Sequence, residues 1–137
     1  MTNATTYGLS ISLDRPFDAT VEATRAALAA EGFGVLMEAD LRATFRKKLN
    51  VDTPPYVILG ACSPPHALEA LQADPDLGLL LPCNVIVRRD QAAGRTVVAA
   101  IDPVVVLGVA ANPALHPVAL VIRERLARVL AALETAP

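Results

Sequence analysis

The first half of the chain switches between the hydrophobic spacing of strands and that of helices. Residues Thr6–Leu13 alternate between apolar and small side chains, which is the pattern of a strand with one buried face. After that strand the apolar positions recur every three or four residues as far as Gly32, which predicts a helix with one stripe on the core. A second strand is expected over Phe33–Glu38, followed by a short helix over Leu41–Leu49 with Asp40 as its N-cap.

The second half contains three segments that are apolar on both sides. Tyr56–Ala61, Val85–Arg88 and Thr96–Ile101 are rich in β-branched residues, and their lengths are those of strands. The last two are separated by a glycine-containing turn, which predicts a hairpin. A short helix is expected between the first two, because Ser63-Pro64-Pro65 is a typical helix start.

The end of the chain contains one segment whose structure the pattern leaves undecided and one segment that it predicts as a helix. Val104–Ala111 is apolar but short, and its pattern leaves a continued strand and a packed loop as alternatives. From Pro117 an apolar stripe at helical spacing predicts a long helix that extends to about Leu133.

These elements predict an α+β fold in a single domain that spans residues 1–137. The order is strand, helix, four strands and helix, with short helices in two of the connections. Strands joined without long crossovers favour an antiparallel sheet, here of about five strands, with the two long helices on one face.

The sheet is expected to be covered on both faces. A sheet with one wet face alternates, yet the three strands of the second half are apolar on both sides. Two long helices can cover only one face, so a second copy of the chain or an apolar ligand is expected on the other. A symmetric homodimer is the common solution.

Charge and composition argue against several classes of partner. The net charge is −2 and charged residues make up 19%, which is not the pattern of a protein that binds nucleic acid or an anionic membrane surface. The first fifteen residues lack the features of a secretory signal. The longest apolar run, Val97–Ala111, is too short for a membrane span and is broken by Asp102-Pro103. A cytoplasmic protein with two free thiols is therefore expected.

Both cysteines lie at strand ends that an antiparallel pairing brings together. Cys62 ends one strand and Cys83 begins the next. Cys62 also precedes a helix start, where backbone N–H groups stabilise a thiolate and can lower its pKa, so Cys62 is the better nucleophile candidate. The candidate catalytic set is Cys62 as nucleophile, Cys83 as resolving thiol and His66 as base. The alternative is that both cysteines are small buried hydrophobic residues and that His66 is a surface or capping residue.

The remaining polar residues give weaker signals. Asp40 is interpreted as a helix cap first and an acid second. The run Arg46-Lys47-Lys48 is typical of a solvated helix C-terminus, with an anion-contacting patch as the alternative. The chain has only four Cys and His residues and no C-x-x-C pair, so no metal site is predicted. No cofactor is expected, since there is no glycine-rich phosphate loop. The expected ligand-binding residues are Asp40, Ile58, Leu80 and Cys83.

Three segments together resemble one protein family. GFGVLMEADLRATFRKKLN, PPYVILGACSPPHALEAL and LLLPCNVIVRRD, the last followed by a glycine hairpin and AAIDP, are similar to domain-of-unknown-function family 302 (DUF302) of bacteria and archaea. The resemblance covers about Thr6–Leu133 and implies a strand-helix-four-strand-helix fold of the TATA-binding-protein-like type and a homodimer. It names a fold without naming a biochemical role. The family pattern includes the positions of Asp40, Cys62, Pro65, Pro82 and Cys83.

Three functions are compatible with the sequence. The leading hypothesis is a cytoplasmic homodimer that binds a small apolar or thiol-reactive ligand, or a partner, near Cys62 and Cys83. The second is a thiol-dependent redox or sulfur-handling protein that uses both cysteines. The third is a protein-interaction module whose open sheet face is the binding surface. No recognised catalytic motif is present, so whether the protein is an enzyme is left open, with a non-enzymatic role favoured.

Overall fold

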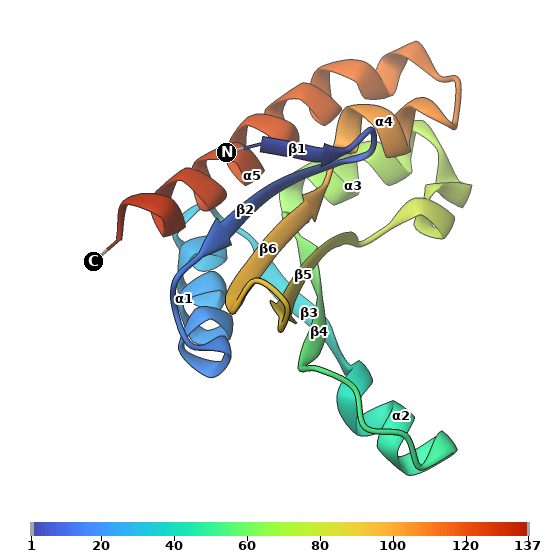
Figure 1. Cartoon of the computed structure of the whole chain (residues 1–137). Helices are drawn as coiled ribbons and strands as arrows, with labels where there is room; N and C mark the ends of the chain where they lie inside the picture. The colour runs from blue at the N-terminus through green and yellow to red at the C-terminus, as the bar shows by residue number, and fades with distance from the viewer. Residues whose placement is uncertain (1, 137) are drawn as a thin grey trace.

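One antiparallel sheet organises the fold, and the computed structural model describes it within residues 2–136 (Figure 1). Its order is β1-β2-β6-β5-β4-β3, and every neighbouring pair is antiparallel. The expected α+β class is confirmed, and β1 is an additional short strand that folds back on β2. The strands are β1 (Thr2–Thr5), β2 (Gly8–Leu13), β3 (Gly34–Asp40), β4 (Tyr56–Cys62), β5 (Cys83–Asp90) and β6 (Arg95–Ile101).

The two long helices, α1 and α5, pack on the same face of the sheet, as expected. The predicted strand-helix-four-strand-helix order is present as β2-α1-β3-β4-β5-β6-α5. The α-helices are α1 (Phe17–Ala30), α2 (Leu41–Leu49), α3 (Pro64–Ala73), α4 (Pro103–Gly108) and α5 (His116–Thr135), and two 3₁₀ helices are η1 (Pro75–Leu80) and η2 (Pro113–Leu115).

The main core lies between the sheet and these two helices. Alternate residues of the central strands point toward the helices, so each strand contributes every second side chain. Complete burial of one such aliphatic side chain stabilises the fold by roughly 1.5–3 kcal/mol. Side chains with almost no exposed surface include Leu28, Leu59, Val85, Val87, Val98, Leu126 and Leu130.

A second, smaller core lies at one end of the sheet. It joins α3, η1, α4 and η2 to the first half of α5. Its buried residues are Ala70, Leu77, Leu107, Leu115, Val118 and Ala119. This cluster borders the site described below.

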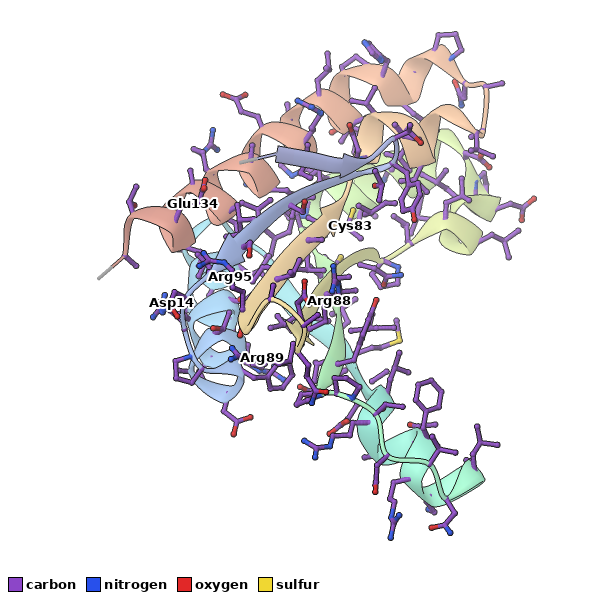
Figure 2. The ribbon with its side chains drawn as sticks, viewed as in Figure 1. Asp14, Cys83, Arg88, Arg89, Arg95 and Glu134 are labelled. Carbon is purple, nitrogen blue, oxygen red and sulfur yellow. The ribbon has the colours of Figure 1, made fainter. Side chains whose placement is uncertain are left out.

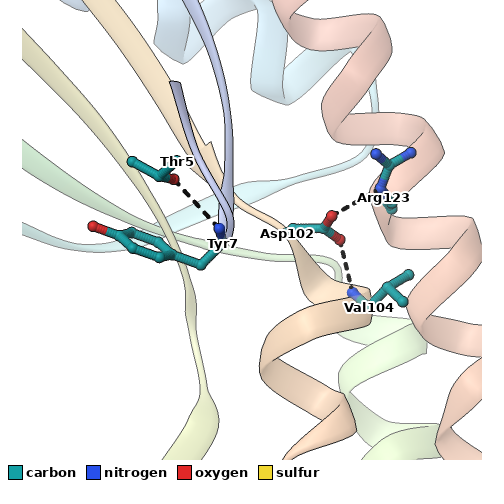
Figure 3. A network of polar contacts seen from close by, with 5 residues as sticks. All are labelled: Thr5, Tyr7, Asp102, Val104 and Arg123. Atoms are coloured by element: carbon teal, nitrogen blue, oxygen red, sulfur yellow. Dashed lines mark hydrogen bonds and ion pairs between the residues drawn. The ribbon is translucent and has the colours of Figure 1, made fainter. Parts of the chain in front are cut away.

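The interpretation of Val104–Ala111 as a continued strand or a packed loop is wrong, because most of this segment belongs to helix α4. The Oδ1 atom of Asp102 accepts a hydrogen bond from the Val104 N–H at 3.0 Å, and Pro103 occupies the first turn. The Nε of Arg123 in α5 donates to Asp102 Oδ2 at 3.0 Å (Figure 3). Asp102 therefore caps α4 and fastens it to α5. Six residues are too few for a hydrophobic period to identify a helix.

The first strand is shorter than its alternation predicts. Tyr7 was expected to share the buried side of the strand with Leu9, but it lies in the turn before β2 and is 57% exposed. Its N–H donates to Thr5 Oγ1 at 3.4 Å (Figure 3), and its carbonyl accepts from the Asp102 N–H at 2.8 Å.

Helix α2 projects away from the other helices, beyond the ends of β3 and β4 (Figure 1). Asp40 caps it as predicted, with Oδ1 accepting from the Ala43 N–H at 3.0 Å. The stripe formed by Leu41, Phe45 and Leu49 is nevertheless only partly covered, since Leu41 and Phe45 are half-buried and Leu49 is 65% exposed.

The sheet face opposite α1 and α5 keeps a partly exposed apolar strip. The pairings of Ile58 with Ile86 and of Ile86 with Ala99 place these side chains in one row across three strands. All three are half-buried, and a groove of about 380 Å³ runs along this face between Tyr56 and Ile101. We call this surface the open face.

The structure predicts that Gly60 cannot carry a side chain. A Cβ atom there would lie 2.8 Å from Cγ of Pro82 and 3.5 Å from Cβ of Met37. Gly60→Ala is expected to lower the free energy of unfolding by about 1–3 kcal/mol, measured by urea denaturation. Gly78→Ala is the control, because its Cβ would meet nothing within 4 Å. Equal effects of the two substitutions would contradict this packing.

Candidate functional site

An apolar cavity of about 280 Å³ lies at the end of the sheet where β4 stops and β5 starts. Cys83 marks this end, which is remote from α2 (Figure 2). Helices α3, α4 and α5 and the 3₁₀ helix η1 supply its other walls. Side chains that line the cavity include Phe33, Cys62, His66, Ala67, Cys83, Leu107, Val118 and Ile122.

The junction between β4 and α3 places three polar residues at the cavity. β4 ends at Cys62, and Pro64 begins α3 after a single residue. Proline suits the first helical turn, because its missing N–H would have no partner there. Ser63 occupies the cap position as predicted, but its side chain makes no cap hydrogen bond.

The hydroxyl of Ser63 instead pairs with the ring of His66, with 2.7 Å between Oγ and Nδ1. Ser63 is buried and His66 is half-buried. Because Nδ1 is engaged by the hydroxyl, Nε2 is the ring nitrogen that remains for a ligand. This histidine is the polar group that can orient a molecule in the cavity.

The two cysteines line the same cavity but are not directly opposite each other. The register pairs Cys83 with Ala61, so Cys62 lies one residue further along β4. Both thiols are free, with Cys83 buried and Cys62 half-buried. The pleat therefore assigns the two cysteines to opposite sides of the sheet, and they share the cavity only because both lie at the strand ends.

The pKa of Cys62 is raised, in the direction opposite to the one that the helix start indicated. Burial raises the pKa of the Cys62 thiol. Burial, and to a smaller extent the charge of a Cys62 thiolate, raises the pKa of Cys83 to about 11. Among the described residues that line the cavity there is no Lys or Arg to favour a thiolate. Both cysteines are therefore neutral thiols near pH 7.

The other expected ligand-binding residues lie elsewhere. Asp40 pairs with Val57 at the opposite end of β3 and caps α2. Ile58 lies on the open face, and Leu80 packs against the second core from η1. In the part of the chain that the structure describes, none of Asp40, Ile58 and Leu80 lines the cavity, so the expected set of four divides over four places.

Several wall residues were not predicted from the sequence. Phe33 lies just before β3, Leu107 in α4 and Ile122 in α5, and each has the local sequence pattern of an ordinary core residue. The sequence signal for the cavity is the small size of Ala67 and Ala70, which lie on one side of α3 and both line the cavity.

Two further observations concern metal binding and membrane spans. No three His, Cys, Asp or Glu side chains within residues 2–136 group to hold a metal ion. Over the same described residues, no helix has the length and apolar character needed to cross a membrane.

The raised pKa of Cys83 predicts a pH-dependent stability. The thiol titrates near its ordinary value of 9.0 in the unfolded chain and near 11 in the folded one. The stabilisation from the neutral buried thiol is therefore complete below pH 9 and is lost as the pH rises toward 11. Between these values the unfolding free energy of the wild type should fall by about 2 kcal/mol more than that of Cys83→Ala, measured by urea denaturation. Parallel pH profiles would show that Cys83 is not buried as described.

Comparisons with known proteins agree with this architecture. The family model described as domain of unknown function DUF302 matches residues 9–133. A crystal structure of an uncharacterised conserved DUF302 protein from Bacillus stearothermophilus has a TM-score of 0.84 and 29% sequence identity, over 93% of this chain and 98% of that one. No curated protein matches the sequence. The chain therefore belongs to the DUF302 family, whose function is unknown.

Proposed function

We propose that the protein binds a small, largely apolar ligand in the cavity between Cys62, His66 and Cys83. The observation that carries this proposal is the cavity itself, about 280 Å³ with an almost entirely apolar lining and one half-buried histidine. An apolar enclosure with few polar groups is the usual form of a small-molecule site. The neutral state of both thiols adds to its apolar character.

The volume indicates the size of the ligand. A cavity of about 150 Å³ accepts benzene, so about 280 Å³ suits a two-ring aromatic molecule or a branched aliphatic one of similar size. A single acceptor or donor on the ligand would pair with Nε2 of His66. A bulky or highly charged ligand is disfavoured, because a charge would lose its hydration without a counter-ion.

The proposal includes a homodimer in the cytoplasm. The half-buried row of Ile58, Ile86 and Ala99 on the open face supports self-association, because apolar strips of this kind are commonly covered in symmetric dimers. A reducing compartment suits two free thiols beside an apolar cavity.

Filling the cavity tests ligand binding directly. Ala67 lines the cavity in α3, whereas Ala73 is exposed at the end of the same helix. We expect Ala67→Leu to weaken the binding of indole at least tenfold, because its side chain occupies the ligand volume, and Ala73→Leu to leave it unchanged. The chain contains no tryptophan, so the fluorescence of the added indole reports on binding without interference from the protein. Equal affinities in the two variants would contradict the assignment.

A thiol-dependent function is the second candidate. It is favoured by one observation, that two free thiols line one cavity closely enough for the charge of one to raise the pKa of the other. The raised pKa values weigh against it, because the thiolate is the nucleophile and is scarce in both cysteines near pH 7.

Alkylation with iodoacetamide separates the two candidates. Ligand binding predicts that Cys62 in the native protein reacts more slowly near pH 7 than a free cysteine in an unstructured peptide, and that Cys83 reacts only after unfolding. Mass spectrometry of digested samples taken from pH 6 to 10 gives the rate at each site. Rapid reaction of Cys62 with an apparent pKa below that of the free peptide would favour the thiol-dependent function instead.

A further inference from the structure

The exposed helix α2 has the shape and charge to cover the mouth of the cavity in another copy of the chain. We propose that the dimer is reciprocal, with α2 of each protomer docked on α3 and η1 of its partner, and that this contact closes the ligand site. The inference rests on the proposed function, since it names what completes the cavity described above.

Helix α2 carries an apolar stripe with a strongly basic flank. Residues 41–50 contain four basic residues and no acidic one, and one of the four, Arg46, is paired with Asp52 at 3.4 Å. Leu41, Phe45 and Leu49 lie along one side of the helix, where residues four apart are neighbours. None of them is buried in the single chain. An amphipathic helix that projects from its own molecule is a typical partner for an apolar groove.

The surface around the cavity mouth has the opposite charge. Residues 53–87 contain Glu69, Asp74 and Asp76 and no Lys or Arg. The same region exposes three leucines, with Leu68 60%, Leu71 36% and Leu79 88% accessible. Leu71 also lines the cavity. This combination of exposed leucines and carboxylates is complementary to the apolar stripe and the cations of α2.

The topology brings these surfaces together in a two-fold dimer. Helix α2 follows Asp40, which pairs with Val57, whereas the cavity lies at the opposite end, where Gly34 pairs with Cys62. Seven strand residues separate these ends by about 20 Å. An axis that makes the strands of two copies antiparallel therefore brings each α2 to the end of the sheet at which the other protomer's cavity lies. Because the two contacts are equivalent, the assembly closes as a dimer.

The open face is the surface that supports this orientation. The free edge of β3 is interrupted by a register shift between Val35 and Met37, and such irregularities disfavour edge-to-edge pairing of strands. The apolar row that includes Ile58 and Ile86 is continuous across β4, β5 and β6. When the open faces of two copies pack together with one α2 at each side, the apolar row of the open face and the apolar stripe of α2 are buried together.

Charge reversal with rescue tests the contact. We expect the wild type to be a dimer by light scattering at micromolar concentration. Arg42→Glu with Lys48→Glu, the two exposed cations that flank the apolar stripe, should weaken dimerisation and indole binding at least tenfold, and Glu69→Lys with Asp76→Lys should do the same. The four substitutions together should restore both properties, because the charges are again opposite. Asp18→Lys in α1 is the control, as it reverses an exposed acid outside the proposed contact.

Each outcome decides one part of the proposal. A monomeric wild type, a dimer that resists both reversals, or the absence of rescue overturns the docking of α2. Monomeric variants that bind indole as tightly as the wild type overturn the closure of the site. A rescued dimer that binds no indole in any form supports the contact and contradicts the ligand-binding function, so the two failures are distinguishable.

Discussion

The cavity exists because a helix with small inward-facing residues lies across the end of the sheet. β4 turns into α3 with only Ser63 between them, so α3 is held against the strand ends and faces α5. Ala67 and Ala70 allow the helix to approach without filling the space behind it. Unfilled apolar volume forgoes dispersion contacts and lowers stability. The proposed function assigns this volume of about 280 Å³ to a ligand.

The same apolar enclosure determines the chemistry of the site. It raises the pKa of both thiols, and the described wall residues include no cation that would oppose this effect. The cysteines therefore contribute soft, neutral surface to the cavity rather than a nucleophile near pH 7. The pair formed by Ser63 and His66 leaves one ring nitrogen as the directional contact. These features favour binding over catalysis.

Sequence reasoning succeeded where the determining interactions are local. The cap at Asp40 and the long apolar stripe of α5 depend on residues within one or two turns, and both are confirmed. It failed for the pKa of Cys62, because the helix N-terminus is visible in the sequence whereas the surrounding apolar walls are not. Ile58 was placed with Cys83 because both lie in neighbouring strands, but register assigns them to opposite faces of the sheet.

The most direct test of the ligand-binding account is the response of methyl groups to indole in solution, followed by two-dimensional NMR of the methyl-labelled protein. Leu107, Val118 and Ile122 line the cavity, whereas Leu9 and Val21 belong to the main core outside it. The account predicts saturable shifts of the first three resonances, with little change in the other two. Shifts spread evenly over both sets, or confined to residues of the open face, would contradict it.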